Sequence, residues 1–392
     1  MQYRINQRNG DKLSVLGYGC LRYTKKAGKL DVAKAEEEML RGLELGINYF
    51  DTAYVYRGSE ELLGNFLAQG YRSKVFIATK LPHYQVKTLA EAKKIFQEEL
   101  RRLRTDYLDY YLLHMLNDVK SWERLCELGI KEWLESLKSQ GIIKNLGFSY
   151  HGGTQGFKEV IDAYNWDFCQ IQFNYMDEYS QAGREGLNYA AQRGLPVFIM
   201  EPLRGGRLTE DLPSTAKAIF AGATPQRTPA QWGLRWLWNE SDVTLVLSGM
   251  NDLAQVEENC KEASVAAANC LGSDELAVYD EVKQCIAASV KVTCTGCSYC
   301  MPCPQGVDIP NCLRCYNISY SDSWFRALKE YFMTTTLRRS RTNAGACVSC
   351  GKCRRHCPQG LDVPQEISRA RQRLENPVYK VAALVAKHIT KF

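Results

Sequence analysis

Short apolar runs alternate with longer amphipathic stretches between residue 10 and about residue 265. The runs have strand length, and the stretches between them repeat apolar residues with the period of a helix, as in parallel strands joined by crossover helices. Helical patterns include residues 32–45, 89–103, 183–193 and 253–262. Eight runs have strand character, at 15–19, 47–50, 75–79, 107–113, 145–149, 168–173, 196–200 and 243–247.

This count of strand and helix units predicts an α/β fold, a (β/α)8 TIM barrel, because such barrels need about 250 residues. A doubly wound open sheet is the alternative arrangement. Residues 3–5 and 12–14 flank Asn9-Gly10 and predict a hairpin, since Asn-Gly suits a tight turn, and this hairpin would cap the bottom of the barrel. We expect the barrel over residues 1–272, a linker helix over 273–290, a small cysteine-rich, mainly α-helical domain over 291–376 and a helical tail over 377–392.

Composition restricts the partners and the compartment. The net charge is +6 with both signs interspersed, so we expect no nucleic-acid and no membrane partner. The first residues carry no apolar signal core, which favours the cytoplasm. In that reducing compartment the sixteen cysteines predict metal ligation instead of disulfides, and ten of them lie between Cys294 and Cys357.

Four polar residues stand at or just beyond predicted strand ends, where TIM barrels carry their chemistry. Asp51 follows the second run and Tyr56 lies five residues later, while Lys80 closes the third run and His114 the fourth. A lysine beside an aspartate stays charged, and a cation near a phenol lowers the phenol pKa. A phenol tuned in this way can give a proton to a carbonyl oxygen, which a histidine can help to hold.

These residues lie in segments that resemble the aldo-keto reductases over roughly residues 10–265. Asn48–Gly64 resembles the segment that carries the family's aspartate and tyrosine, and Ala78–Lys80, Asp109–His114 and Gly141–Ser149 resemble the following landmarks in order. The resemblance implies that Tyr56 is the general acid, Lys80 lowers its pKa, Asp51 pairs with Lys80 and His114 orients a carbonyl. Tyr54 is a competing phenol, but the family places its acid just before a Gly-Ser-Glu turn like that at 58–60.

The same resemblance implies a nicotinamide dinucleotide, NADH or NADPH, across the barrel mouth. Three departures affect it: Met200 replaces the aromatic residue that stacks on the nicotinamide, Leu247–Gln255 contains no lysine or arginine for the 2′-phosphate of NADP, and one asparagine is replaced. Tyr150 stands where the family has that asparagine. The implied cofactor contacts are Ser149, Gln170, Met200, Pro202, Leu203, Gly205, Leu208, Ser248, Gly249, Met250, Gln255, Glu258 and Asn259.

Two cysteine runs carry the strongest metal signal. Cys347, Cys350, Cys353 and Cys357-Pro358 fit the C-x2-C-x2-C-x3-C-P spacing of ferredoxins, and Cys294, Cys297, Cys300 and Cys303-Pro304 form a second run with one residue fewer before the last cysteine. In two-cluster ferredoxins the fourth cysteine of each run binds the other cluster. We therefore predict two [4Fe-4S] clusters, one held by Cys294, Cys297, Cys300 and Cys357 and the other by Cys347, Cys350, Cys353 and Cys303.

Both runs continue alike, with Pro304–Pro310 matching Pro358–Pro364. This internal repeat favours two similar cluster sites over a zinc site. Cys312 and Cys315 form another C-x-x-C pair, which could replace a ligand but reads more simply as a pair of structural thiols.

These features predict an oxidoreductase that acts on a small carbonyl or alcohol substrate with NAD(P)H and is coupled to the clusters. One alternative is a reductase fed by ferredoxin or another redox protein, with single electrons or with a flavin as converter, although no flavin motif is present. Another is a non-enzymatic electron-transfer protein that uses the barrel as a scaffold.

Overall fold

The computed structural model describes residues 1–26, 28–336 and 341–389. The chain forms two compact units, Met1–Pro202 with Gln231–Leu271, and Leu203–Ala230 with Gly272–Phe392. The last three residues of the predicted tail, 390–392, and residues 337–340 of the predicted cysteine-rich domain lie outside the described residues.

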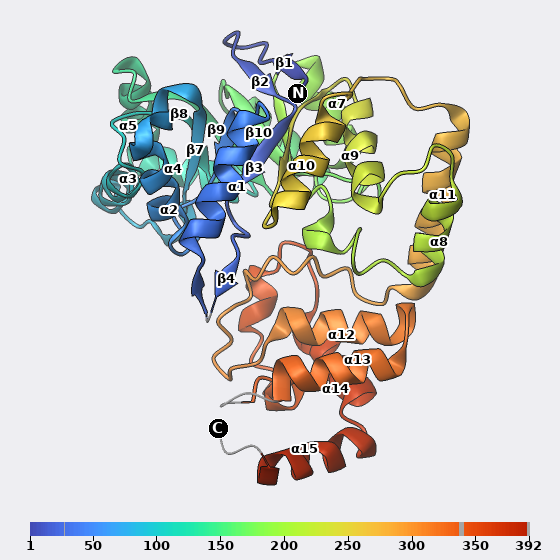
Figure 1. Ribbon diagram of the computed structural model, residues 1–392. Helices are drawn as coiled ribbons and strands as arrows, with labels where there is room; N and C mark the ends of the chain where they lie inside the picture. Colours follow the sequence, from blue (N-terminus) through green and yellow to red (C-terminus); the bar gives the residue numbers. More distant parts are fainter. Residues whose placement is uncertain (27, 337–340, 390–392) are drawn as a thin grey trace. The chain divides into compact units, whose positions relative to one another are not determined.

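The first unit contains a closed barrel of eight parallel strands, in the order β10-β11-β12-β3-β6-β7-β8-β9 (Figure 1). The pairing of Val246 with Leu16 closes the barrel between its last and first strands. All eight predicted strands and the (β/α)8 fold are confirmed, and the doubly wound sheet is not the fold. The strands are β3 (Leu16–Gly19), β6 (Tyr49–Asp51), β7 (Phe76–Leu81), β8 (Leu108–Leu113), β9 (Ile143–Tyr150), β10 (Phe168–Gln172), β11 (Val197–Met200) and β12 (Val243–Ser248).

Aromatic side chains fill the barrel interior. The ring of Tyr110 lies 5.2 Å from that of Tyr49 and 5.0 Å from that of Phe168. Gly147 makes room for this packing, because a Cβ atom there would lie 2.5 Å from the Phe168 ring. The centre of the barrel is thus a packed core, and polar chemistry is confined to the strand ends.

Amphipathic helices follow the strands of the first unit, and the predicted helices 32–45, 89–103, 183–193 and 253–262 are present within one residue at each end. Side-chain caps fix two starts: Asp31 accepts from the Lys34 N–H and Thr88 from the Glu91 N–H. The helices are α1 (Val32–Glu44), α2 (Ser59–Phe66), α3 (Leu89–Leu103), α4 (Val119–Glu127), α5 (Ile130–Ser139), α6 (Thr154–Asp162), α7 (Gly183–Gln192), α9 (Pro229–Asn239) and α10 (Leu253–Ala263).

Two antiparallel hairpins accompany the barrel. The predicted one pairs β1 (Tyr3–Ile5) with β2 (Lys12–Ser14), and Leu13 packs in the barrel core beside Tyr110. The second pairs β4 (Lys25–Lys26) with β5 (Lys29–Leu30). Short 3-10 or π turns are η1 (Leu67–Tyr71), η2 (Arg72–Lys74), η3 (His83–Gln85), η4 (Arg204–Gly206), η5 (Phe332–Thr336), η6 (Ala344–Ala346) and η7 (Lys352–His356).

The second unit is helical, and α12, α13 and α14 pack against one another (Figure 1). The predicted linker helix corresponds to α11. Cys312 and Cys315 are fully buried in the core of this unit, where they pack as apolar side chains. The helices are α8 (Ser214–Gly222), α11 (Ser273–Ser289), α12 (Ile309–Ser321), α13 (Trp324–Tyr331), α14 (Val363–Leu374) and α15 (Pro377–Ile389).

Segment Leu203–Ala230 follows β11 in the chain but packs with the cysteine-rich region. The sequence boundary at residue 272 did not anticipate this, because the segment precedes the last barrel strand. Among the described helices none is long and apolar enough to cross a bilayer.

Candidate functional site

The four predicted catalytic residues come from three neighbouring strands. Asp51 ends β6, Lys80 lies near the end of β7, and His114 follows β8 directly and donates its N–H to the Leu81 carbonyl at 2.9 Å. Tyr56 lies in the turn between β6 and α2. Parallel strands bring their carboxyl ends to one edge, so the sequence order itself places these side chains together.

Lys80 connects two of the other three residues. Its Nζ donates to Asp51 Oδ1 and, at 2.7 Å, to the Thr52 carbonyl. The same Nζ lies 5.4 Å from the ring centroid of Tyr56, within cation–π range. Burial raises the pKa of Asp51, and Lys80 and Gln170 oppose that rise. The buried lysine is therefore held by a carboxylate on one side and faces the phenol on the other.

The structure separates the two competing phenols. The Tyr56 ring is half-buried and meets His114 edge-on, with 6.0 Å between ring centroids and 84° between planes. The Tyr54 ring instead stacks under Arg102, whose Cζ lies 4.4 Å from its centroid. This arrangement supports the assignment of Tyr56 as the acid.

The imidazole at the site is neutral near pH 7. Burial lowers the pKa of His114 well below its usual range, the charge of Lys80 lowers it further, and the neighbouring imidazoles of His151 and His83 contribute when they are protonated. His83 and His151 were not predicted as site residues. Burial lowers the pKa of each of them to about 4. No spacing or motif marked these two histidines in the sequence, since only the fold brings them near His114.

Two predicted nicotinamide contacts pair across adjacent strands. Ser149 on β9 is the register partner of Gln170 on β10, and both are buried. Gln170 Nε2 donates to Asp51 Oδ2 at 3.3 Å. The Oε1 atom of Gln170 is buried and has no hydrogen-bond partner among the described residues. A ligand that carries an N–H donor, such as a carboxamide, would satisfy this acceptor. The residues present therefore fit a nicotinamide.

Two further predicted contacts meet beyond β12, where Asn259 on α10 donates to Ser248 Oγ at 3.3 Å. The Met250 carbonyl accepts from the Tyr18 hydroxyl, and Gln255 Oε1 accepts from the Asn251 N–H. Tyr150, which replaces the family's asparagine, donates to the Gly153 carbonyl at 2.6 Å. Glu258 lies on α10 beside Asn259.

Distant parts of the chain supply cations where Leu247–Gln255 has none. The stem of Arg22 lies against Gly249, where an added Cβ would be 3.3 Å from it, and its Nη2 lies 3.8 Å from Glu201 Oε1. Lys34 Nζ, from α1, lies 3.5 Å from Asp252 Oδ2. Asp252 itself caps α10 by accepting from the Ala254 N–H. The folded chain therefore places two cations, Arg22 and Lys34, beside this stretch, although the stretch itself contains none.

The predicted pyrophosphate loop divides between the compact units. Met200 ends β11 and is half-buried, and Pro202 follows in the first unit. The predicted contacts Leu203, Gly205 and Leu208 belong to the second unit. Gly205 has φ 64°, a conformation that favours glycine.

Four cysteines of the first predicted cluster set are electrostatic neighbours. Burial raises the pKa of Cys300, and the nearby thiolates of Cys297, Cys294 and Cys357 raise it further. Burial raises the pKa of Cys357, and repulsion from Cys294 raises it further, whereas the backbone N–H groups of Leu361, Gln359 and Gly360 lower it. Thus the fourth cysteine of the second run approaches the first run.

The second set shows the reciprocal proximity. After burial, the thiolates of Cys347 and Cys303 raise the pKa of Cys353. Cys350 is exposed in the same loop, and the Ser349 N–H donates to Cys347 Sγ at 3.4 Å. The arrangement of donors fits the crosswise assignment of cysteines to two clusters.

Matching left-handed residues shape both cysteine loops. Two residues after the first cysteine, Gly296 has φ 71° and Ser349 φ 55°, and one residue after the second cysteine, Ser298 has φ 67° and Gly351 φ 76°. The likeness continues into the helices, because Asp308 caps α12 and Asp362 caps α14 with nearly the same backbone angles. The sequence repeat is therefore also a structural repeat.

No group of three or more His, Cys, Asp or Glu side chains in the described part of the chain is arranged to hold one metal ion. A single ion needs donors that converge on one point, whereas the thiolates of a [4Fe-4S] cluster surround a larger body. The spacing C-x2-C-x2-C-x3-C-P of the second run is that of cluster-binding ferredoxins.

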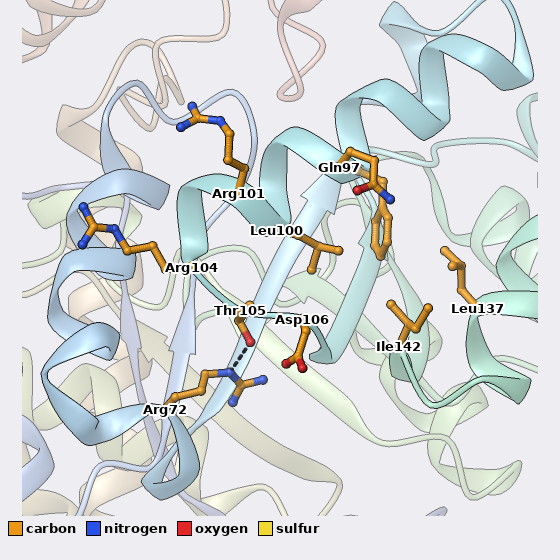
Figure 2. A pocket seen from close by; sticks show the side chains of 10 residues that line it. Arg72, Gln97, Leu100, Arg101, Arg104, Thr105, Asp106, Leu137 and Ile142 are labelled. Atoms are coloured by element: carbon orange, nitrogen blue, oxygen red, sulfur yellow. Dashed lines mark hydrogen bonds between the residues drawn. The ribbon is translucent and has the colours of Figure 1, made fainter.

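Figure 2 shows a surface pocket of about 700 Å³, and none of the predicted site residues lines it. It is lined by the end of α3 and by Asp106 and Ile142, which precede β8 and β9. It therefore opens at the amino ends of the strands, the end that serves stability in TIM barrels. Arg72, in its wall, bonds Thr105 and pairs with Asp109, so we assign the pocket no chemistry.

Two family profiles match the chain. The aldo/keto reductase family matches residues 15–269, and a 4Fe-4S dicluster domain matches residues 293–361. Methylglyoxal reductase YeaE of Escherichia coli (strain K12) is 28% identical over 293 residues, which cover 72% of this chain and 95% of that protein. L-galactose dehydrogenase of Arabidopsis thaliana is 26% identical over 303 residues, or 70% of this chain and 91% of that protein.

Solved structures show the same barrel. Aldo-keto reductase AKR11C1 from Bacillus halodurans, in its holo form, superposes with a TM-score of 0.60 and 26% identity, over 72% of this chain and 96% of that one. An aldo-keto reductase from Klebsiella pneumoniae in complex with NADPH gives 0.58 at 23% identity, over 72% and 95%, a likeness of fold alone. The chain therefore belongs to the aldo/keto reductase family and is an oxidoreductase that carries a 4Fe-4S dicluster domain after its barrel.

Proposed function

We propose that the protein reduces an aldehyde or a ketone to an alcohol, or catalyses the reverse, with a nicotinamide dinucleotide as hydride source and Tyr56 as general acid or base. The observation that carries the proposal is the position of Lys80, which bonds Asp51 and lies 5.4 Å from the Tyr56 ring centroid. A barrel scaffold without catalysis would not need a buried ammonium directed at a phenol.

The side chains divide the proton chemistry among them. Tyr56 gives its proton to the carbonyl oxygen, and the ammonium of Lys80 stabilises the phenolate that remains. Asp51 holds that ammonium in place. Neutral His114 donates a hydrogen bond to the same oxygen without adding charge. A bound reduced nicotinamide supplies the hydride.

Residues at the mouth of the barrel would hold the dinucleotide. The unsatisfied Oε1 of Gln170 suits the nicotinamide carboxamide, with Ser149 on the adjacent strand. Asn259 and Ser248 would take the adenosine end. Arg22 and Lys34 could bind a 2′-phosphate, so NADPH is the form we propose.

The two predicted clusters, held by Cys294, Cys297, Cys300 and Cys357 and by Cys347, Cys350, Cys353 and Cys303, exchange one electron each. Oxidation of one NADPH to NADP+ and a proton would supply both clusters with one electron each, in competition with the carbonyl, whose reduction consumes both electrons of the hydride. A flavin would supply the conversion from an electron pair to single electrons in the alternative account. We propose that these clusters exchange electrons with the reaction in the barrel. Reduced cysteines require a reducing compartment, which supports the cytoplasm.

A small carbonyl is the proposed substrate class, supported by the relative named for methylglyoxal. The test uses anaerobic, cluster-loaded protein with methylglyoxal and NADPH deuterated at C4 of the nicotinamide. We expect one deuterium per molecule of alcohol product with the native protein, and with Tyr56→Phe the same label in a product that forms about 10²- to 10⁴-fold more slowly. Turnover that requires reduced ferredoxin and leaves the product without deuterium would overturn the proposal.

A further inference from the structure

The loop that follows β11 is fixed at both ends within the cysteine-rich unit. Near its start, Arg204 Nη2 donates to the Thr293 carbonyl at 3.2 Å, one residue before Cys294. Near its end, Asp211 accepts both arms of Arg314 on α12, at 2.7 and 2.8 Å. Bidentate pairs of this kind fix orientation as well as distance. The loop therefore holds its middle residues in place.

Arg207 lies between these two anchors, against the first cysteine loop. Its Nη2 donates to Cys294 Sγ at 3.9 Å. The guanidinium also approaches Gly296 so closely that a Cβ atom there would lie 3.3 Å from Nη2. Glycine at this position, with φ 71°, thus serves both the loop conformation and the approach of the arginine.

Little free space separates the loop from the cysteine segment. The cavity between them, lined by Arg204, Arg207, Asp211 and Cys294 among others, measures about 30 Å³. This is room for a water molecule or two. A half-buried cation with so little water around it interacts more strongly with a nearby anion than an exposed one.

The second cysteine loop has a different donor at the equivalent sulfur. Cys347 corresponds to Cys294 in the repeat, and its Sγ accepts from the backbone N–H of Ser349, a neutral group. Arg354 and Arg355 follow Cys353, but both are exposed, so water and salt screen them. The repeat is thus symmetric in backbone and asymmetric in charge.

We propose that Arg207 makes the two clusters unequal, raising the reduction potential of the cluster bound by Cys294 above that of the cluster bound by Cys347. Reduction adds one electron and one negative charge to a cluster, so a cation bonded to a ligand sulfur stabilises the reduced form more. Electrons that enter the domain would then rest first on the Cys294 cluster. The inference relies on the proposed two-cluster assignment.

The native protein gives the first test. Cluster-loaded full-length protein is titrated anaerobically with dithionite through redox mediators, and the reduced clusters are followed by electron paramagnetic resonance. We expect two one-electron steps at resolved potentials. A single potential for both clusters would overturn the proposal.

Substitution assigns the steps. Arg207→Gln should lower only the higher potential, with about a tenfold smaller ratio of reduced to oxidised cluster at a fixed potential, or about 59 mV for one electron. Arg355→Gln is the control, because it removes the same charge from an exposed position two residues before Cys357. A shift of the lower potential, no shift, or an equal shift in the control would contradict the proposal.

Loading and tuning are measured separately. Should Arg207→Gln fail to load, Arg207→Met removes the charge and keeps an unbranched side chain: a fall of the higher potential supports the proposal, and an unchanged potential overturns it. Iron and acid-labile sulfide for fewer than two clusters in the native protein would overturn the cluster assignment itself. Two loaded clusters of equal potential would overturn only the role of Arg207.

Discussion

The barrel mouth and the cysteine-rich unit both set a cation against an acidic group, but they hold it by different means. Lys80 and Asp51 are buried on neighbouring strands, so the register of the barrel determines their contact. Arg207 and Cys294 lie on loops, and their contact depends on a flanking hydrogen bond, a flanking ion pair and left-handed residues. The positions of side chains on strands follow from the fold, whereas side chains on loops need additional local interactions to hold them in place.

The largest effect should come from the phenol. Tyr56→Phe should lower kcat for carbonyl reduction by about 10²- to 10⁴-fold, the usual contribution of general acid catalysis. Tyr54→Phe is the matched control, since that ring stacks under Arg102, and it should stay within a few-fold of the native rate. Steady-state kinetics with NADPH and methylglyoxal compares them, and equal losses in both variants would refute the assignment of Tyr56.

The buried histidines should make the barrel sensitive to acid. The folded-state pKa of His83 is about 4, below the unfolded value near 6.5, so the unfolded chain takes up the proton first. Stability is full above pH 6.5 and falls until about pH 4, by about 3 kcal/mol for this group. Denaturant unfolding at both pH values should show a smaller loss in His83→Gln.

Glu38 supplies a control of opposite sign. Its folded-state pKa is raised to about 7, chiefly by burial, so this group gains stability as the pH falls. Glu38→Gln should therefore steepen the acid loss that His83→Gln reduces. Parallel changes in the two variants would show that other groups control the acid response.

A smaller effect concerns the cofactor. Lys34→Gln should weaken NADPH binding about tenfold, the equivalent of one charge-assisted hydrogen bond, and leave NADH binding unchanged. Lys87→Gln, on an exposed residue of the same unit, should change neither. Fluorescence titration measures both dissociation constants. If Lys34→Gln weakens the binding of both nucleotides equally, the lysine does not recognise the 2′-phosphate.

The smallest change is a halving of the iron content. Cys357→Ala removes a ligand that we assign to the Cys294 cluster, so we expect iron for one cluster instead of two. Cys270→Ala, an exposed cysteine outside both runs, should retain all the iron. Loss of both clusters, or of neither, would contradict independent sites with crosswise ligands.

The sequence predicts the barrel and the four residues Asp51, Tyr56, Lys80 and His114, because both follow from periodicity and strand order. It also predicts the repeat in the cysteine loops, since Pro304–Pro310 and Pro358–Pro364 preserve the same turn and cap residues. It could not find His83 beside His114, or Arg22 against Gly249, because these contacts join segments without a shared motif.

The sequence also could not predict that Leu203–Ala230 belongs to the second unit, for a related reason. Its hydrophobic pattern does not reveal which of two cores it joins. That choice is expressed in side-chain contacts such as Asp211 with Arg314 and Arg204 with Thr293. Those contacts join the segment to residues much later in the chain, which belong to the cysteine-rich unit.

The central claim is that nicotinamide chemistry in the barrel and the clusters belong to one redox system. Its most direct test adds NADPH, NADH or reduced ferredoxin separately to anaerobic, cluster-loaded protein and follows the visible absorption of the clusters. We predict that NADPH bleaches them, and that the alcohol product together with NADP+ bleaches them faster in the native protein than in Tyr56→Phe, because the alcohol must first pass its hydride to NADP+. Bleaching by reduced ferredoxin alone would contradict the account.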